Sequence, residues 1–265
     1  MRSIVRARWR FPLRHSLVIA VTLVVMVFPS LSVQAQAKSA EESDLPERRE
    51  IHHTYRLAPG STVDVSTVAG PVEIETTNND SAQVDIIESG QTRADLECFK
   101  TIVEQMSTRL VIRHEQKESC GNVRDYQRVR LILPRSVNVS LEFIAGFVHV
   151  DPIDGMLRLN SIAGPVTVAR AQTAEILSLA QGLTMGFAQP RDRGINISSI
   201  MGGVDLSVSP GVNANLRVTS LVGKIRNEAS DISVTDTGSG YQIVIGSGGK
   251  ISSLSSISGG IKIHH

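Results

Sequence analysis

Aromatic residues are scarce in this chain and make up 4% of its 265 residues. The single tryptophan is Trp9. Beyond residue 37 the aromatic residues are Tyr55, Tyr126, Tyr241, Phe99, Phe143, Phe147 and Phe187. Because sugar-binding sites rely on the faces of aromatic rings, this scarcity argues against a dedicated glycan-binding groove.

Sequence motifs of catalysis are missing as well. The chain has no Gly-x-Ser-x-Gly nucleophile motif and no phosphate-binding loop. Closely spaced carboxylates include Glu73 with Glu75 and Asp151 with Asp154. Carboxylates so close together on a strand or in a turn are typically solvated, and do not serve as a general acid and its base. We therefore expect no catalytic residue, no cofactor and no metal site.

Cysteine is limited to two residues, Cys98 and Cys120. In an exported chain two such cysteines are expected to pair, and the loop of about 22 residues that they close predicts roughly 3 kcal/mol of stabilisation. The alternative is a reactive thiol or a metal ligand. The sequence disfavours it, because there is no Cys-x-x-Cys and the nearest histidine, His114, stands alone.

The N-terminus has the layout of a signal peptide. An apolar stretch, residues 16–33, follows five arginines that no acidic residue accompanies, and Ala35-Gln-Ala37 supplies the small residues of a cleavage site. We predict a signal peptide over residues 1–37 and export to the periplasm, the outer surface or the medium. The alternative is a retained anchor helix on a membrane-bound regulator, and only then is the membrane a partner.

Removal of residues 1–37 changes the net charge. It takes away five of the 27 basic residues and none of the 26 acidic ones, which leaves 22 against 26, or −4. A mildly acidic chain has no basic field for nucleic acid, so we expect no nucleic-acid partner. Residues 38–50 are polar and charged and predict a flexible tether.

A ten-residue pattern recurs along the chain, most clearly as Leu159-Asn-Ser-Ile-Ala-Gly-Pro-Val-Thr-Val168. The glycine spacing is 18 residues from Gly146 to Gly164 and 21 from Gly202 to Gly223. The intervals of 38 residues after Gly164 and 36 after Gly223 each leave room for one degenerate copy. A period of this length indicates one coil of a solenoid. Further copies lie at residues 65–74, 141–150, 197–206, 218–227 and 254–263.

Two residue types keep a fixed place in the pattern. A glycine is expected at the corner between two strands, where the chain would need a conformation that a Cβ obstructs. A serine three residues earlier is expected to point into the coil and to form a hydrogen-bonded ladder with its equivalents. The predicted corners are Gly70, Gly146, Gly164, Gly202, Gly223 and Gly259, and the predicted serine ladder is Ser161, Ser199, Ser220 and Ser256.

These patterns predict an all-β protein. We expect a parallel β-solenoid, a right-handed β-helix, with about three short strands in each coil. Residues 51–135 are expected to form an embellished β region with a short helix near residues 92–99 and the candidate disulfide, and residues 136–265 the solenoid repeats. A β-sandwich of hairpins is the structural alternative.

The last repeat, residues 254–263, ends two residues before the C-terminus. In a solenoid that follows the sequence, it would be an uncovered edge, so we expect either fraying or self-association through this strand.

The segment Tyr55-Arg-Leu-Ala-Pro-Gly-Ser-Thr-Val-Asp-Val65, residues 68–74 and the repeats together resemble a family of exported bacterial proteins with an adhesin-like domain of unknown function. The resemblance covers about residues 51–263. It implies a non-enzymatic binding or scaffolding role at the cell envelope or surface, with an envelope protein or surface ligand as partner. It identifies no binding residues. The competing hypothesis is a polysaccharide-active β-helix enzyme, which a cleft with three or more convergent carboxylates or basic side chains would favour.

Overall fold

The structure of the chain, a computed structural model, describes residues 45–121, 123–191 and 194–265, which belong to one compact unit. The predicted signal peptide and residues 38–44 of the predicted tether lie outside the described residues. The tether prediction is wrong at its C-terminal end, because residues 47–50 begin a strand with antiparallel pairing to residues 87–90. No helix in the described part is long and apolar enough to cross a membrane.

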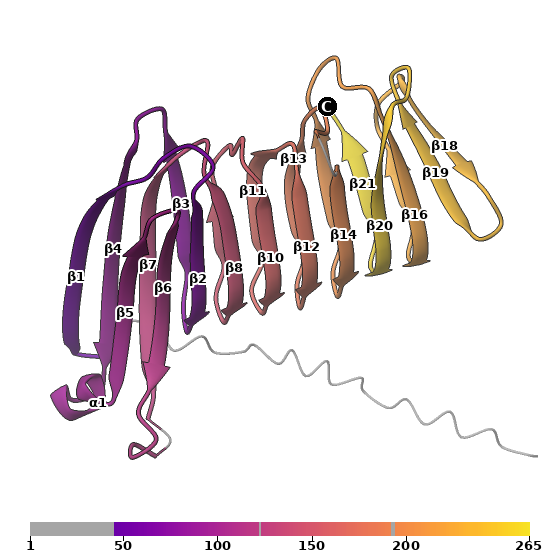
Figure 1. Ribbon diagram of the computed structural model, residues 1–265. Coiled ribbons are helices and arrows are strands. Elements are labelled where there is room, and N and C mark those ends of the chain that lie inside the picture. Colours follow the sequence, from indigo (N-terminus) through magenta and orange to yellow (C-terminus); the bar gives the residue numbers. More distant parts are fainter. Residues whose placement is uncertain (1–44, 122, 192–193) are drawn as a thin grey trace, which may run out of the picture. The chain divides into compact units, whose positions relative to one another are not determined.

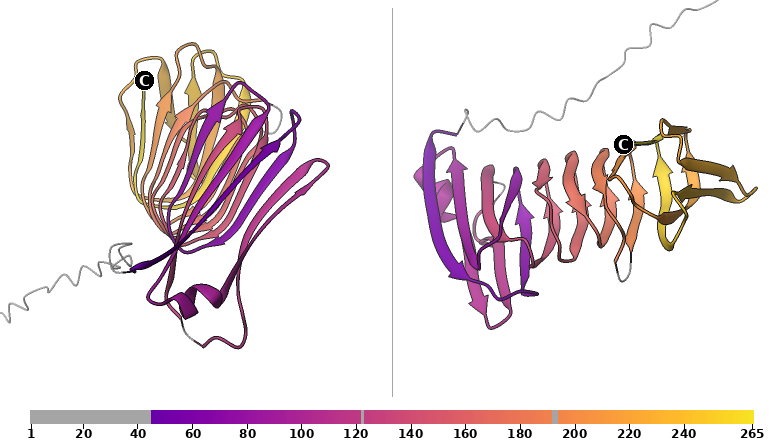
Figure 2. Two further views of the ribbon diagram at one scale, coloured as in Figure 1. Left: turned by 90° about the vertical axis from the view of Figure 1, so that its left-hand side faces the viewer. Right: turned by 90° about the horizontal axis from the view of Figure 1, so that it is seen from above.

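The described residues form two large sheets, which face each other across one apolar core (Figures 1 and 2). The ten-stranded sheet has the spatial order β1 (Glu47–Arg56), β4 (Ser81–Gly90), β7 (Asp125–Pro134), β3 (Val72–Thr77), β9 (Val148–Val150), β11 (Val166–Ala171), β13 (Leu183–Phe187), β15 (Val204–Val208), β21 (Ile261–His264) and β17 (Ile225–Asn227).

The eleven-stranded sheet lies toward the viewer in Figure 1. Its spatial order is β18 (Ile232–Asp236), β19 (Gly240–Ile245), β16 (Ala214–Val222), β20 (Lys250–Ser258), β14 (Ile195–Ile200), β12 (Ala174–Leu179), β10 (Leu157–Ile162), β8 (Asn138–Ile144), β2 (Thr62–Val68), β6 (Arg109–Gln116) and β5 (Phe99–Met106). The short helix α1 (Arg93–Glu97) is confirmed, with Thr92 as its N-cap.

A coil of this fold is one strand of the eleven-stranded sheet followed by one strand of the ten-stranded sheet. The pairs β8–β9, β10–β11, β12–β13 and β14–β15 stack in sequence order with parallel pairing in both sheets. The prediction of three strands in each coil is therefore wrong: a period of about 18 residues holds two strands and two connections. Parallel pairing through the centre agrees with the predicted solenoid, and the hand of the coils stays a prediction.

The degenerate copy expected between Gly164 and Gly202 is confirmed as the coil β12–β13. The one expected between Gly223 and Gly259 is not a coil. That stretch contains β17 and the antiparallel pair β18–β19. The β-sandwich alternative requires antiparallel pairing throughout. Within the described residues, antiparallel pairing occurs at the two ends of the stack: among β16, β18 and β19 at one end, and among β1, β4, β5, β6 and β7 at the other.

The last repeat does not form an edge of either sheet. Strand β20 lies between β14 and β16, and β21 lies between β15 and β17, so both strands have partners on two sides. The C-terminal coil is thus inserted between two coils that precede it in sequence. The prediction of an uncovered C-terminal edge, and of self-association through it, is wrong because the spatial order of the coils departs from their sequence order.

The boundary predicted near residue 135, between the N-terminal β region and the solenoid repeats, is not a break in the fold. Strand β2 pairs with β8 and β3 pairs with β9 across that point, so the stack is continuous from residue 62 onward. The inserted segment from β4 to β7 closes the N-terminal end. In it, β6 and β7 add parallel strands beside β2 and β3, and β4 and β5 are antiparallel.

One backbone feature sets which residues face the core. In β10, Leu157 and Leu159 are buried, but the next buried residue is Ile162, not Ser161. Ser161 has φ of 57°, a left-handed conformation that interrupts the alternation and turns the following residue inward. The same conformation recurs at the equivalent position of the other coils, at Thr67, Phe143, Ser178, Ser199, Ser220 and Ser256.

Candidate binding surface

The prediction that the repeated serines point into the coil and form a ladder is wrong. Ser199, Ser220 and Ser256 are exposed and Ser161 is half-buried, so their side chains do not fill the coil interior. Among the described residues, no hydrogen bond joins one of these serines to another; Ser161 Oγ instead lies 3.4 Å from Asn160 Oδ1. Short polar side chains tolerate the left-handed region better than most, which accounts for serine at this position.

The predicted corner glycines are stacked on one another, but the physical reason differs from the one expected. Only Gly223 and Gly259, with φ of 154° and 149°, have a backbone that favours glycine. At Gly164 an added Cβ would lie 2.2 Å from the carbonyl oxygen of Gly146, and at Gly146 it would lie 2.1 Å from that of Gly70. The neighbouring coil, and not the local dihedral angle, excludes a side chain here.

The disulfide between Cys98 and Cys120 is present, with the two Cα atoms 5.7 Å apart. It links the end of α1 to the loop after β6. Neither cysteine is free to act as a nucleophile.

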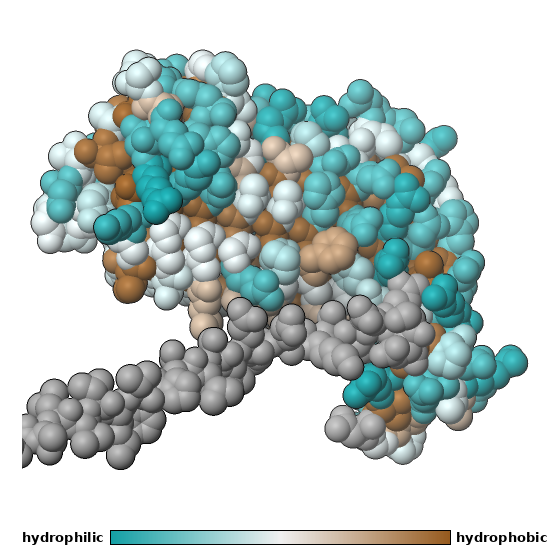
Figure 3. Space-filling model, turned by 180° about the vertical axis from the view of Figure 1, so that it is seen from behind, coloured by the Kyte–Doolittle hydropathy of each residue, from teal (hydrophilic) through white to brown (hydrophobic). Residues whose placement is uncertain are grey.

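A groove of about 640 Å³ lies on the outer face of the ten-stranded sheet. The surface is hollowed here because the outward positions just before β13, β15 and β21 are the glycines Gly182, Gly203 and Gly260, which have no side chain to fill the space. Hydrogen bonds connect these positions in one row, since Leu183 N donates to Gly203 O at 2.9 Å and Val204 N to Gly260 O at 2.9 Å. Figure 3 shows the molecule from behind, where pale atoms of intermediate hydropathy run across the middle between hydrophilic groups.

The polar side chains of the groove form a second row across the same strands. The backbone register pairs Thr167 of β11 with Thr184 of β13, Thr184 with Asp205 of β15, Asp205 with Lys262 of β21, and Lys262 with Arg226 of β17. Outward side chains of neighbouring parallel strands in register stand about 5 Å apart. The groove therefore presents two hydroxyls at one end and two cations at the other.

The lining of the groove has more basic than acidic side chains. Lys224 lies two residues before Arg226 in the chain and is the third basic residue of the lining. Asp205 is the one carboxylate of that lining, and its Oδ1 lies 2.8 Å from His264 Nε2. Lys262 pairs with exposed Glu228 at 3.2 Å, whereas Lys224 and Arg226 have no hydrogen-bonding or ionic partner among the described residues.

Several other charged side chains of this sheet have partners. Glu75 accepts from Arg130 at 2.8 Å, and His52 contacts Asp85. Asp151 accepts a hydrogen bond from the Thr76 amide at 3.3 Å. One carboxylate of each closely spaced pair, Glu75 of Glu73/Glu75 and Asp151 of Asp151/Asp154, thus has a hydrogen-bonding partner within the fold.

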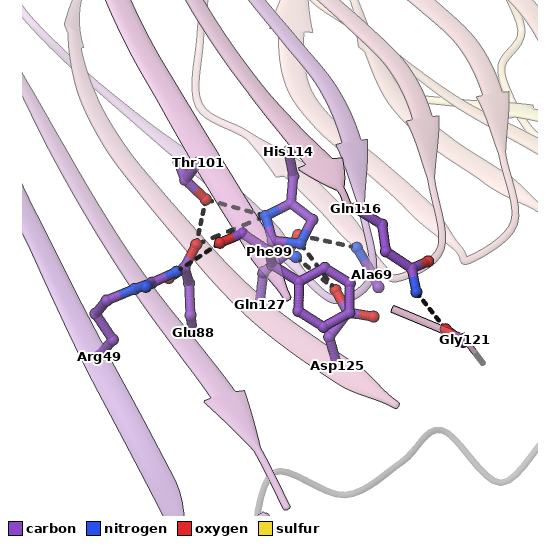
Figure 4. Close-up of polar contacts among 10 residues, drawn as sticks. All are labelled: Arg49, Ala69, Glu88, Phe99, Thr101, His114, Gln116, Gly121, Asp125 and Gln127. Atoms are coloured by element: carbon purple, nitrogen blue, oxygen red, sulfur yellow. Dashed lines mark hydrogen bonds and ion pairs between the residues drawn. The ribbon is translucent and has the colours of Figure 1, made fainter. Parts of the chain in front are cut away.

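A buried polar cluster joins the two sheets at their N-terminal end (Figure 4). Glu88 of β4 is 2% exposed and accepts hydrogen bonds from Arg49 of β1 and Thr101 of β5. His114 of β6 lies with Nδ1 3.0 Å from Thr101 Oγ1 and with Nε2 3.1 Å from Asp125 Oδ2 of β7. The expectation that His114 stands alone is therefore wrong, because strands distant in sequence bring partners to it.

Contacts with charged neighbours outweigh burial in setting the direction of the pKa shifts of His114 and Glu88. Burial alone would lower the pKa of His114, but its contacts with Asp125 and then Glu88 outweigh burial and raise the pKa above its ordinary value of 6.5. Burial alone would raise the pKa of Glu88, but its contacts with His114 and then Arg49 lower the pKa below its ordinary value of 4.5. The raised pKa favours the charged form of His114, whose ring nitrogens face Thr101 and the carboxylate of Asp125.

The cluster contains the groups of a nucleophilic triad but is enclosed. His114 is 8% exposed and its ring stacks on Phe99 with the ring centres 4.9 Å apart. The hydroxyl of Thr101 is committed to Glu88. The arrangement therefore clamps β1, β4 and β7 to β5 and β6, and it offers no approach for a substrate. The sequence contains a signal for the burial of His114, because His114 continues the alternation of the inward residues Leu110 and Ile112.

The described residues contain no group of three or more His, Cys, Asp or Glu side chains that could hold a metal ion.

No protein-family model matches the chain, and no curated protein matches it in sequence. Solved structures of candidate adhesins, distant in sequence, do match. A candidate cell adhesion protein from Clostridium sporogenes matches with a TM-score of 0.45 at 11% identity, over 82% of this chain and 99% of that chain. A candidate adhesin from Bacteroides fragilis matches with a TM-score of 0.33 at 14% identity, over 82% of this chain and 98% of that chain. With TM-scores below 0.5, these likenesses assign no function.

Proposed function

We propose that the chain is an exported, non-enzymatic β-solenoid of adhesin-like type, with right-handed coils, that binds a surface or envelope ligand through the groove on its ten-stranded sheet. The observation that carries this proposal is the groove itself, an open hollow with threonine hydroxyls and unpaired cations on a rigid sheet. Each inner strand that forms its floor is paired on both sides, so the surface is preorganised. The disulfide and the leader pattern support an oxidising compartment outside the cytoplasm.

A polysaccharide-active enzyme is the second candidate, because three basic side chains, Lys224, Arg226 and Lys262, line one groove. Hydrolysis of a glycosidic bond normally uses two carboxyl groups roughly 5 to 10 Å apart. Among the described residues of the lining, Asp205 is the one carboxylate, and His264 is bonded to it. This donor set supports binding better than hydrolysis.

The test is retention of the purified protein on washed envelope fragments of the bacterium that makes it. Thr184→Trp fills the groove and is expected to weaken retention by about tenfold or more. Thr219→Trp adds the same bulk to the outer face of the eleven-stranded sheet and is the matched control, with retention expected to be unchanged. Equal retention of wild type and Thr184→Trp contradicts the proposal. Release of new reducing ends from envelope polysaccharide would instead support the enzyme.

A further inference from the structure

The groove has a chemical polarity that indicates its ligand. Exposed Lys224 and Arg226 stand at its β17 end without partners among the described residues, beside Lys262 on β21. A surface cation with no partner is available for an anion at little desolvation cost, and the guanidinium of Arg226 fits a carboxylate in a bidentate manner. This end of the groove therefore suits a negatively charged group.

The other end of the groove suits hydroxyl groups. Thr167 and Thr184 are exposed and adjacent across β11 and β13, and each hydroxyl can both donate and accept. Because the floor residues Gly182, Gly203 and Gly260 have no side chains, a sugar ring can approach the backbone closely. The lining contains no aromatic residue, so recognition there depends on hydrogen bonds and charge and not on ring stacking.

We propose that the groove binds an acidic polysaccharide, which lies across strands β11 to β17 with a carboxylate at Lys224 and Arg226 and with sugar hydroxyls at Thr167 and Thr184. This inference rests on the proposed function and names the ligand class of that site.

Three other occupants of the groove fit less well. An extended peptide adds along a free sheet edge, but β13, β15 and β21 are paired on both sides, and the edge strand β17 (Ile225–Asn227) has three residues. Single-stranded nucleic acid needs aromatic stacking, and a lipid tail needs an apolar wall.

The experiment measures binding of three polymers to the purified protein by calorimetry: oligogalacturonate, neutral dextran and polyglutamate of matched length. Oligogalacturonate is expected to bind, more weakly as salt is raised, and dextran is not. Lys224→Ser with Arg226→Ser is expected to weaken oligogalacturonate binding by about tenfold or more. Lys100→Ser with Arg217→Ser removes one lysine and one arginine from the other sheet, and it is expected to bind as wild type.

The hydroxyl end has its own test. Thr167→Val with Thr184→Val is expected to weaken oligogalacturonate binding several-fold and to leave any weak polyglutamate binding unchanged. Equal affinity for oligogalacturonate and polyglutamate, or equal losses in the two charge variants, would mean attraction by charge alone and would overturn the inference. So would no binding of oligogalacturonate, even if envelope fragments are still retained in a Thr184-dependent manner; the proposed function then stands without this ligand. Shortening of the oligogalacturonate during the measurement would keep the ligand class and contradict the non-enzymatic role.

Discussion

At the scale of single residues, the stacked glycines are the most constrained positions of the repeat. Gly164→Ala is expected to destabilise the protein by about 1 to 3 kcal/mol, because the new methyl group meets the backbone of the next coil. Urea denaturation measures the loss. Gly121→Ala is the control, since an added Cβ there meets nothing within 4 Å. Equal stability of Gly164→Ala and wild type would show that the coils do not pack this closely.

Phe143 is an exception to the serine pattern. It has φ of 56° although it is 57% exposed, and a bulky residue in that region is strained. Phe143→Asn is expected to raise the free energy of unfolding by about 0.5 to 1 kcal/mol, because asparagine tolerates the left-handed conformation. Phe147→Asn, at a second exposed phenylalanine with ordinary φ, is expected to bring no gain. A loss of stability in Phe143→Asn would indicate that its ring packs against a neighbour after all.

Sequence periodicity predicted the position of the repeats but not the conformation inside them. The serine and glycine columns were identified correctly, yet simple alternation placed Ser161 inward, because one left-handed residue reverses the side on which every later residue falls. The groove was not predicted. Its components, such as Thr184 and Lys262, are unremarkable outward residues, and only the register of strands 78 residues apart in sequence brings them together.

At the scale of strands and the elements between them, the buried cluster ties the N-terminal strands together in a pH-dependent manner. The raised pKa of His114 means that its contribution to stability is present below the unfolded value of 6.5 and is lost as pH rises through the higher folded value. The lowered pKa of Glu88 means that its contribution is present above 4.5 and is lost as pH falls through the lower folded value. The cluster is thus most stabilising between these two ordinary values.

The matching prediction compares His114→Asn with wild type by urea denaturation at pH 5.5 and pH 8.5. The stability difference between the two proteins is expected to be larger at pH 5.5, where wild-type His114 carries its charge in both the folded and the unfolded state. His53→Asn replaces an exposed histidine of β1 and serves as the control, with the same small effect at both pH values. A His114→Asn effect independent of pH would mean that the imidazole is neutral in the fold.

At the scale of the whole molecule, each coil contacts only its neighbours, so damage at one end is expected to stay there. The Cys98–Cys120 disulfide closes a separation of 22 residues at the N-terminal end, and its removal is expected to cost roughly 3 kcal/mol by the chain-entropy estimate. Hydrogen exchange of Cys98→Ser with Cys120→Ser should therefore show faster exchange in β5 and β6.

The inserted C-terminal coil, β20 and β21, should exchange as slowly as β14 and β15, because all four strands are paired on both sides. Faster exchange at both ends would mean that the coils unfold as one cooperative unit, and fast exchange in β20 and β21 of the wild type would contradict their insertion between the earlier coils.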